Sequence, residues 1–422
     1  MASYIEKETQ AYLEGFSSRR RAKNYSERCR RESGKRQKES AELQRLLAAY
    51  GPFERVLDMP CGAGPYFDLV KANSRVTVGA DGSPSQMEEA AQTHTLGNGL
   101  TAVQANAAHL PFKDASFDCV LSVRFFHHLF SGAARVEAFK ELARVSSRFV
   151  LVTFYDYTKF GIYKSAVERL RGRSKKMNLK SVALSRFAIE AAKAGLKLVK
   201  ASHYRLGTRS IFVLFEKCPQ EAAEFLKKPE ALCRRLRIGK IVEPMLPLIL
   251  TAMSLVTFSI EWKEVEKDIL LWGMGLPILA LGALLLGGGL FFKRRHAQSP
   301  FNPEGPYKVV RHPMVAGAIV WMAGLSAMCE IPWFIPIAAV LLYFSFGPIM
   351  ELAEARMFLA HENAYDEYCA ETARLMPYRG AFKEYLRDIF VENARFEGAF
   401  QYTYSILFFV AGVFFAIAKE LF

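Results

Sequence analysis

The sequence lacks the cysteine patterns that define two classes of protein. Its 422 residues include seven cysteines, an odd number, scattered along the chain without a Cys-x-x-Cys pair. A disulfide scaffold and a zinc ribbon are therefore excluded, and a protein that faces the cytosol is favoured. We predict no metal site.

Long uncharged runs are absent before residue 240, and residues 1–50 are largely charged and polar. We therefore expect no cleavable secretion signal. Beyond residue 240, five runs contain no Asp, Glu, Lys or Arg: Pro244–Ile260, Ile269–Phe292, Pro313–Cys329, Ile331–Met350 and Gly398–Ala418. Because about 17 to 25 apolar residues cross a bilayer, we predict a soluble half joined to an all-α membrane half of about five transmembrane helices. For the shorter first and third runs, buried core helices or re-entrant segments are the alternative.

Acidic residues are fewer than basic ones. The 56 Lys and Arg against 42 Asp and Glu give a formal net charge of +14, which suits nucleic acid or an anionic lipid surface. The run Arg19–Lys38 holds ten Lys and Arg against two Glu, with Tyr25 as its single aromatic residue. Since single-stranded nucleic acid binds on interleaved aromatic side chains, we predict contact with anionic lipid, here and at Lys164–Lys180, and no nucleic acid. A helix that covers a neighbouring site and a solvated basic helix are the alternatives for the first run.

The charges between the apolar runs predict their orientation. The acidic segment Glu261–Asp268 separates the first two runs, whereas Lys293–Arg295 ends the second. Positive residues stay on the cytoplasmic side of a membrane. The soluble half and residues 293–312 and 353–397 are therefore predicted to face the cytoplasm in a multi-pass integral membrane protein.

A glycine-rich turn lies between a predicted strand and a predicted helix. The apolar pair Val56 and Leu57 precedes Asp58, glycines stand at positions 62 and 64, and a helix is expected to begin near Tyr66. Glycines let the backbone approach a ligand closely, and helix N-terminal amides point at its polar groups. A second predicted strand ends in Asp81, at a spacing where an acidic side chain accepts hydrogen bonds from ribose hydroxyls. The sequence therefore predicts a nucleotide-type site.

The turn has neither the dinucleotide pattern G-x-G-x-x-G nor the lysine of a phosphate-binding loop. The pattern D-x-x-C-G-x-G at Asp58–Gly64 instead resembles the first motif of class I S-adenosylmethionine-dependent methyltransferases. The resemblance continues through Asp81, through Asn106–Phe112 and through strands expected at Phe117–Ser122 and Phe149–Phe154, and it covers about residues 50–217. It implies an α/β Rossmann-like domain with S-adenosylmethionine as cofactor.

The same resemblance assigns residues to each part of the cofactor: Asp58, Gly62 and Gly64 to its methionine part, Asp81 to its ribose, and Asn106 and Ala107 to its adenine. Asn106 stands where the family more often has Asp. An amide oxygen still accepts a hydrogen bond from the adenine amino group, so this departure is expected to be tolerated.

Catalytic residues are hard to predict for methyl transfer from a sulfonium, because the donor is already activated and positioning lowers most of the barrier. The candidates for a base follow the fourth and fifth strands: His128 and Tyr155, with Arg124, His127 and Asp156 beside them. A neutral imidazole can take a proton from a hydroxyl or amine acceptor. The alternative for the histidines is a packing or helix-capping role.

A second motif lies in the membrane half. Gly305–Met314 has the pattern G-P-Y-x-x-x-R-H-P-M, and Glu351–Arg356 and a Tyr-x-x-Tyr element follow the fourth apolar run. These elements resemble the isoprenylcysteine carboxyl methyltransferase family and its phospholipid methyltransferase relatives over about residues 240–380. Val315 and the pair His361-Glu362 depart from the pattern.

This second resemblance implies a second S-adenosylmethionine site. Arg311 is suited to pair with the carboxylate of the cofactor, and Tyr307 or His312 to bond the carboxylate or the adenine. Glu354 and Arg356 would close the pocket and position the acceptor as catalytic residues. The alternative is that Arg311 is a charged anchor at the end of a span.

Together the patterns predict five segments: a basic helical segment at 1–49, a class I methyltransferase domain at 50–217, a basic amphipathic linker at 218–240, a membrane methyltransferase-like domain at 241–397 and a final transmembrane helix at 398–422. We predict an integral membrane enzyme that methylates a membrane lipid or a lipophilic small molecule, for instance by successive methylations of a headgroup amine. The alternatives are one active domain with a degenerate one that serves as anchor or regulatory cap, and a non-enzymatic membrane scaffold. No oligomeric state is predicted.

Overall fold

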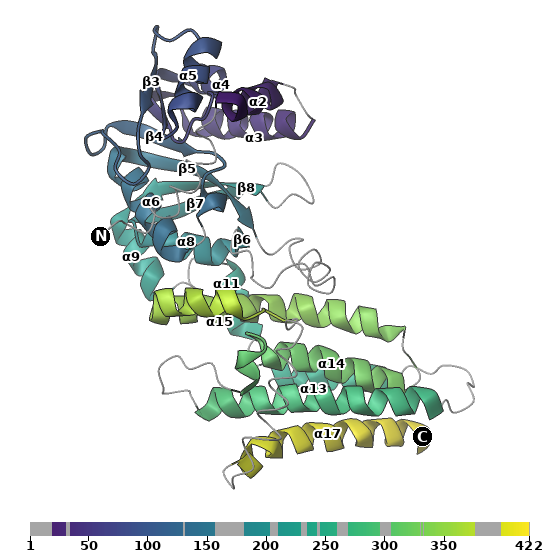
Figure 1. Cartoon of the computed structure of the whole chain (residues 1–422). Helices are drawn as coiled ribbons and strands as arrows, with labels where there is room; N and C mark the ends of the chain where they lie inside the picture. The colour runs from purple at the N-terminus through teal and green to yellow at the C-terminus, as the bar shows by residue number, and fades with distance from the viewer. Residues whose placement is uncertain are drawn as a thin grey trace. The chain divides into compact units, whose positions relative to one another are not determined.

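The computed structural model describes the following residues of the chain: 19–30, 34–129, 131–156, 181–202, 210–228, 234–242, 245–259, 269–295, 305–329, 331, 333–375 and 398–421. They form two compact units (Figure 1). We call the first the sheet unit, residues 1–165 and 178–229, and the second the helical unit, residues 166–177 and 230–422. The predicted basic stretch Lys164–Lys180 and acidic segment Glu261–Asp268 lie outside the described residues.

The sheet unit is built on one sheet of eight strands: β1 Phe53–Asp58, β2 Ser74–Asp81, β3 Leu100–Gln104, β4 Phe117–Ser122, β5 Ser146–Asp156, β6 Ser181–Val182, β7 Leu196–Ser202 and β8 Ser210–Lys217. The order is β3-β2-β1-β4-β5-β8-β7, with the short β6 paired to β5. Strands β1 to β5 pair in parallel, and β8 is antiparallel to both β5 and β7. This is the Rossmann-like sheet that the sequence predicts, and both expected strands, Phe117–Ser122 and Phe149–Phe154, lie in it.

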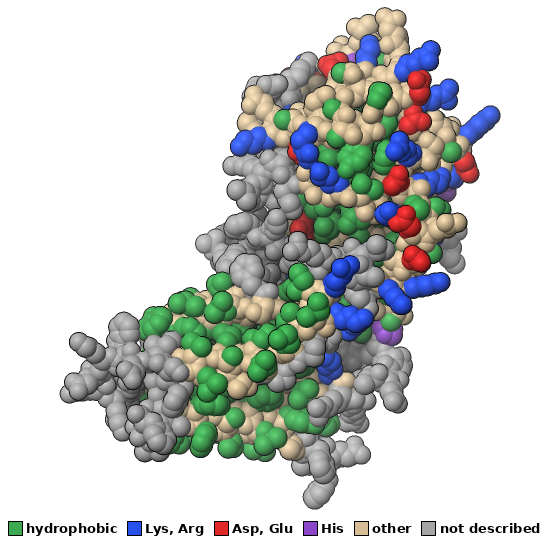
Figure 2. Space-filling model, turned by 180° about the vertical axis from the view of Figure 1, so that it is seen from behind, with side chains coloured by type: hydrophobic (Ala, Val, Ile, Leu, Met, Phe, Trp, Pro, Cys, Tyr) green, Lys and Arg blue, Asp and Glu red, His purple; other side chains and the backbone are tan. Residues whose placement is uncertain are grey.

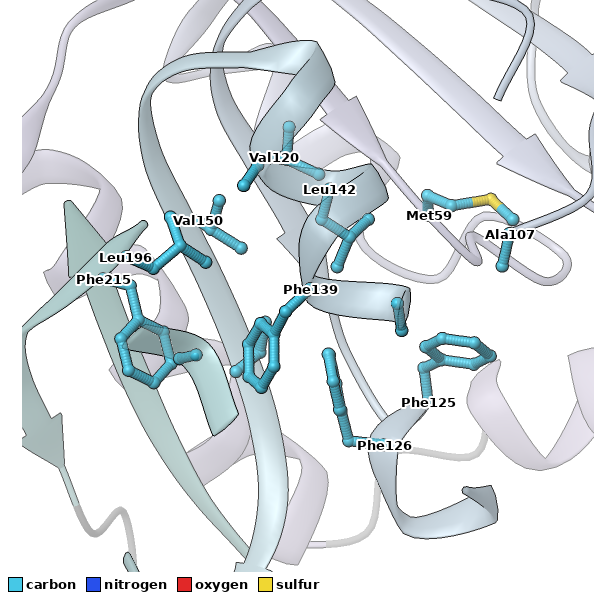
Figure 3. Close-up of a cluster of buried hydrophobic side chains, with 14 of the residues drawn as sticks. Met59, Ala107, Val120, Phe125, Phe126, Phe139, Leu142, Val150, Leu196 and Phe215 are labelled. Atoms are coloured by element: carbon cyan, nitrogen blue, oxygen red, sulfur yellow. The ribbon is translucent and has the colours of Figure 1, made fainter. Parts of the chain in front are cut away.

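Helices cover both faces of the sheet, because successive residues of its central strands are apolar and point to opposite faces. Leu57, Val120 and Val150 face α6 Gly132–Val145 and α8 Leu184–Ala192 in one core cluster (Figure 3). Their neighbours in sequence, such as Val56, Cys119 and Leu151, face α3 Gly34–Tyr50 in another. The remaining helices of the unit are α2 Arg19–Arg30, α4 Phe67–Lys71, α5 Pro84–Thr93 and α9 Pro219–Lys227.

The basic N-terminal run forms part of the sheet unit. Helix α3 buries Leu43, Leu46 and Leu47 against the sheet, and α2 lies beside α5, where Arg19 pairs with Glu88 at 2.9 Å. The side chains of this ion pair are largely exposed, so it adds little stability. The run therefore packs on the sheet unit through α2, while its cover of a neighbouring site and its contact with lipid stay predictions.

The helical unit contains α11 Arg234–Val242, α12 Leu246–Ser259, α13 Ile269–Arg295, the short turn η3 Gly305–Lys308, α14 Pro313–Met328, α15 Phe334–Glu371 and α17 Gly398–Leu421. Each of the five apolar runs therefore falls on a helix. Among the described residues, two stretches are long and apolar enough to cross a membrane, Leu271–Lys293 and Phe334–Glu362. Pro313–Met328 and Thr403–Ile417 are apolar but shorter. Five spans thus stay a prediction, which the structure supports for two helices.

Helices α13 and α14 pack with their backbones in close contact, because glycines recur on the facing sides. A Cβ atom at Gly282 would lie 2.3 Å from the backbone nitrogen of Trp321, and one at Gly324 would lie 2.4 Å from that of Leu279. Gly317 faces Leu286 in the same way at 2.6 Å. Small residues at such spacing let helices associate through van der Waals contact, the usual arrangement in a membrane.

Candidate functional site

The glycine turn, residues 58–64, follows β1 and leads into α4. Gly62 and Gly64 have φ values of 56° and 76°, in the left-handed region that favours glycine. A Cβ atom at Gly64 would lie 2.5 Å from the Phe67 ring. Glycine is therefore required at this position by both the backbone conformation and the close approach of α4.

Asp81 ties the end of β2 to the glycine turn. Its Oδ2 accepts a hydrogen bond from the Gly62 amide at 2.9 Å, and its Oδ1 accepts one from the Ser83 amide at 2.8 Å. Burial raises the pKa of this carboxyl, and the two amides oppose the rise. The two sequence features that predict the site, the turn and the acidic strand end, are thus joined directly.

Asp58 differs from Asp81 because nothing compensates its charge. The side chain is 1% exposed, and neither carboxylate oxygen has a hydrogen-bond partner among the described residues. Burial, together with the neighbouring Asp81 carboxylate, raises the pKa of Asp58 well above its usual range. A buried carboxylate is costly unless it is paired, so this site is suited to a ligand that brings a positive group.

The loop after β3 carries Asn106 and Ala107. The Asn106 side chain accepts a hydrogen bond from the Ala108 amide at 3.0 Å and is exposed, whereas Ala107 is buried. Ala107 belongs to the same core cluster as Met59 of the glycine turn, and Figure 3 labels both. The Ala105 amide, just before this loop, donates to the Asp81 carbonyl at 3.0 Å. The loop therefore begins beside the end of β2, and its assignment to the adenine stays a prediction.

The predicted base candidates follow β4 and β5. The His127 ring stacks on Tyr155 with centroids 4.5 Å apart and lies 4.0 Å from the His128 ring. Ligands of parallel α/β sheets bind at the carboxyl ends of the strands, where these rings lie. The roles of His128 and Tyr155 in catalysis stay predictions.

Arg124, at the end of β4, carries a contact that the sequence did not predict. It has a φ of 62°, its amide donates to Thr153 Oγ1 at 2.7 Å, and its guanidinium pairs with the buried Glu39 of α3. A non-glycine residue in this backbone region is strained and is retained where surrounding contacts fix it. The pair joins the N-terminal helix to the ligand-binding edge of the sheet.

These residues fit S-adenosylmethionine. The cofactor carries an ammonium group for the unpaired Asp58 carboxylate, and the positive-φ glycines allow its close approach to the turn. Asp81 has its carboxylate fixed at the strand end where ribose hydroxyls bind. Comparison with known proteins identifies the kind of domain, and the roles of these individual residues stay predictions.

Residues 57–148 match the methyltransferase domain family. The human protein "Probable tRNA methyltransferase 9B" is 34% identical over 104 residues, which are 24% of this chain and 21% of that protein. A putative methyltransferase of Encephalitozoon cuniculi is 37% identical over 132 residues, 31% of this chain and 59% of its own length. The chain thus spans only part of these relatives.

Solved structures resemble this chain more distantly. Magnesium protoporphyrin IX methyltransferase from Synechocystis with bound S-adenosylhomocysteine is 19% identical, with a TM-score of 0.37, over 43% of this chain and 83% of that one. The PH0226 protein of Pyrococcus horikoshii is 21% identical, with a TM-score of 0.36, over 44% of this chain and 92% of that one.

The sheet unit therefore contains a class I S-adenosylmethionine-dependent methyltransferase domain, as the family match and the strand order define it. It is an enzyme domain, and its cofactor is S-adenosylmethionine.

The second predicted site forms a cluster around one carboxylate in the helical unit. Glu354 Oε1 lies 3.2 Å from Arg311 Nη1 and 3.1 Å from His312 Nε2. Arg374 Nε lies 3.1 Å from the same oxygen. We call these four residues the Glu354 cluster. Burial lowers the pKa of His312, and the hydrogen bond to Glu354 opposes this change.

Arg374 is the member of the cluster that the sequence did not predict. It arrives there because Ala373 forms a bridge with Val310, and the Arg311 and His312 amides donate to the carbonyls of Ala373 and Arg374 at 2.7 and 3.2 Å. A backbone bridge between segments 63 residues apart gives no local sequence signal.

The remaining residues predicted for this site differ in their placement. The Tyr307 hydroxyl donates to the Gly289 carbonyl at 3.4 Å, and its own carbonyl accepts from the Tyr368 hydroxyl at 2.7 Å. Burial raises the pKa of Tyr307 to about 12. Arg356 is exposed and lies two positions beyond Glu354, about 200° around the helix. The structure therefore groups Arg311, His312 and Glu354, and the role of Arg356 stays a prediction.

Proposed function

We propose that the protein is an integral membrane methyltransferase that transfers a methyl group from S-adenosylmethionine to a lipid or a lipid-linked acceptor. The observation that carries the donor side is the buried, unpaired carboxylate of Asp58. When bound, the cofactor supplies a methyl group on a sulfonium, which needs little help from acids or bases. The protein's part is then to bind and orient both reactants.

Asp58 and the glycine turn would hold the amino-acid end of the cofactor, Asp81 its ribose, and Asn106 with Ala107 its adenine. His128 and Tyr155 lie at the same edge of the sheet, where a neutral His128 imidazole or a Tyr155 phenolate would take a proton from an acceptor. The His127 ring stacks on Tyr155 beside them.

The acceptor side of the proposal rests on apolar side chains that the helical unit leaves exposed. Figure 2 shows them spread over the visible face of its helices. They include Leu248 on α12, Met274 on α13, Leu341 on α15, and Leu407 and Phe414 on α17, exposed by 49% to 66%. So many exposed apolar residues are unusual for a soluble monomer and suit a lipid or protein neighbour. A lipid environment also agrees with the glycine contacts of α13 and α14.

We extend the proposal to a second donor site at the Glu354 cluster, on the cytoplasmic side with the first. Arg311 and Arg374 share one carboxylate oxygen, so a guanidinium can turn to the carboxylate of a cofactor with a short movement. The opposing candidate is that the cluster only braces α14 and α15 and the helical unit anchors the sheet unit. Binding of S-adenosylhomocysteine to Asp81→Ala and Arg311→Ala variants distinguishes them, since two sites predict that each variant loses one.

A tRNA acceptor is the second candidate, because relatives that match 104 residues are named probable tRNA methyltransferases and the chain carries a net charge of +14. The family match covers residues 57–148, which hold the candidate cofactor residues, and such a fold is compatible with many acceptors. For this reason the lipid acceptor is preferred.

The test is to follow the methyl group. Detergent-purified full chain is incubated with methyl-tritiated S-adenosylmethionine, a total lipid extract and total RNA from the same cells. We expect label in the chloroform-soluble lipid fraction that the Asp81→Ala variant does not produce. Label confined to RNA would replace the lipid proposal by the tRNA one, and no label in either fraction would contradict both.

A further inference from the structure

The segment that carries the histidines, η1 Phe126–His128, is anchored from inside the sheet unit. The Phe126 ring is 2% exposed and lies 4.4 Å from Phe139 of α6 and 5.2 Å from Phe187 of α8, between centroids. Figure 3 shows Phe126 directed toward Phe139. Because Phe126 occupies the core, His127 and His128 are left at the surface of the segment, partly exposed.

A buried ion pair stands behind the end of the same segment. Arg135 of α6 places Nε and Nη2 each 2.7 Å from the carboxylate of Glu190 on α8. Its third nitrogen, Nη1, donates to the carbonyl of Leu129 at 3.0 Å. The side chains of Arg135 and Glu190 are 2% and 0% exposed, and Arg186 adds a contact to Glu190 at 3.1 Å.

Stability alone does not account for this arrangement. A buried ion pair is seldom more stabilising than apolar side chains of the same volume. What apolar side chains cannot provide is the hydrogen bond to Leu129. Leu129 follows His128 directly, so that bond fixes the backbone from which both histidines extend.

We infer that Arg135, oriented by Glu190, is a positioning residue that fixes the Leu129 carbonyl and so places His127 and His128 against Tyr155 on the acceptor side of the methyl-donor site. The inference rests on the proposed function, since it concerns the acceptor side of that reaction. Arg135 touches neither donor nor acceptor. It acts through the segment that it anchors, and methyl transfer is sensitive to small displacements of the reacting groups.

The test replaces Arg135 by Lys. A lysine keeps the positive charge beside Glu190, but its single ammonium on a flexible stem does not reproduce the planar fork that serves two partners at once. The matched control is Arg144→Lys on the same helix. Arg144 also contacts a glutamate, Glu141, and donates to the carbonyls of Leu110 and Phe112 at 3.0 and 2.8 Å, away from η1.

The readout is the rate at which diethyl pyrocarbonate modifies each histidine of the detergent-purified full chain, measured by peptide mass spectrometry. Arg135→Lys is expected to speed the modification of His127 and His128 several-fold and to leave the exposed His109 unchanged. S-adenosylhomocysteine affinity is expected to stay within about twofold, and the rate of methyl transfer to lipid extract to fall by about tenfold or more. Arg144→Lys is expected to change neither histidine rate.

If His127 and His128 are modified as slowly in Arg135→Lys as in the unaltered protein, the inference is overturned. If Arg135→Lys fails to fold, the double variant Arg135→Met/Glu190→Met removes both buried charges and carries the same expectation. If the proposed function is wrong, the unaltered protein transfers no methyl group to lipid. The modification rates of His127 and His128 still decide whether Arg135 positions them.

Discussion

Two carboxylates, one in each unit, occupy opposite electrostatic situations. Asp58 is buried without a hydrogen-bond partner and beside a second carboxylate, whereas Glu354 accepts contacts from Arg311, His312 and Arg374 on one oxygen. The first site lacks a cation that a ligand can supply. The second already has its cations, so a ligand there must compete with Glu354. We therefore expect the unpaired Asp58 to lower the folding stability of the free protein. The Glu354 cluster, in contrast, should raise it.

The largest effect is expected from Glu354→Gln. Removing the carboxylate leaves guanidinium groups buried without their partner, a change that typically costs about 3–5 kcal/mol. Heating the detergent-purified protein with a thiol probe that reports exposure of the buried Cys329 and Cys369 would measure the loss. Glu367→Gln, an exposed position beyond the kink of α15 at Glu362, is the control and should leave the transition in place. Equal transitions for both variants would show that the cluster does not brace the helices.

Gly64→Ala is expected to have the next largest effect, on the first site alone. The added methyl group meets the Phe67 ring at 2.5 Å, and overpacking together with an unfavourable backbone angle costs about 1–3 kcal/mol. We expect S-adenosylhomocysteine affinity to fall at least about tenfold as the turn shifts.

Gly97→Ala is the matched control for this substitution. Gly97 also has a positive φ, of 105°, but a Cβ atom there meets nothing within 4 Å. It should lower the stability slightly and leave the affinity unchanged. Loss of affinity in both variants would mean that backbone strain, not the fit of the turn, controls binding.

A smaller, graded effect is expected from pH. Because the pKa of Asp58 in the folded protein is raised by burial and by Asp81, the free protein takes up a proton there as the pH falls through that pKa. The ammonium of the cofactor requires the ionised form, so affinity should fall by up to about tenfold per pH unit below the pKa, with a proton released on binding. Calorimetry in buffers of different ionisation enthalpy measures that proton. If binding releases no proton at pH 7 or at any lower pH, the pairing of Asp58 with the cofactor ammonium is contradicted.

How far the sequence predicts this site depends on how local each signal is. Asp58, Gly62 and Gly64 lie within one turn, and Asp81 ends the next strand, so their spacing was sufficient to predict that they meet. The pairs Arg124–Glu39 and Arg135–Glu190 join residues 85 and 55 positions apart. Their members have no mutual pattern in the sequence, and only the packing of α3, α6 and α8 brings them together.

The helical unit shows the same limit at the level of the fold. Uncharged runs predicted where its helices lie, because apolar composition is a property of each run by itself. The lengths of the uncharged runs predicted five membrane spans. Two of the described helices are shorter than their runs, because α12 has 14 residues and α14 has 16. The close contact of α13 and α14 depends on glycines in two separate runs, which become a matched set only when the helices are aligned.

The most direct test of the account is Asp58→Asn, measured by calorimetry with S-adenosylhomocysteine and by thermal unfolding of the free protein. The amide keeps the volume of the side chain and removes its charge. We predict that binding at the glycine turn weakens by about 2–5 kcal/mol. The midpoint of unfolding of the free protein should rise, because the cost of burying an unpaired carboxyl, paid as a charge or as proton uptake, is removed. Unchanged affinity together with an unchanged or lower midpoint would contradict the claim that this carboxylate is kept for the methyl donor.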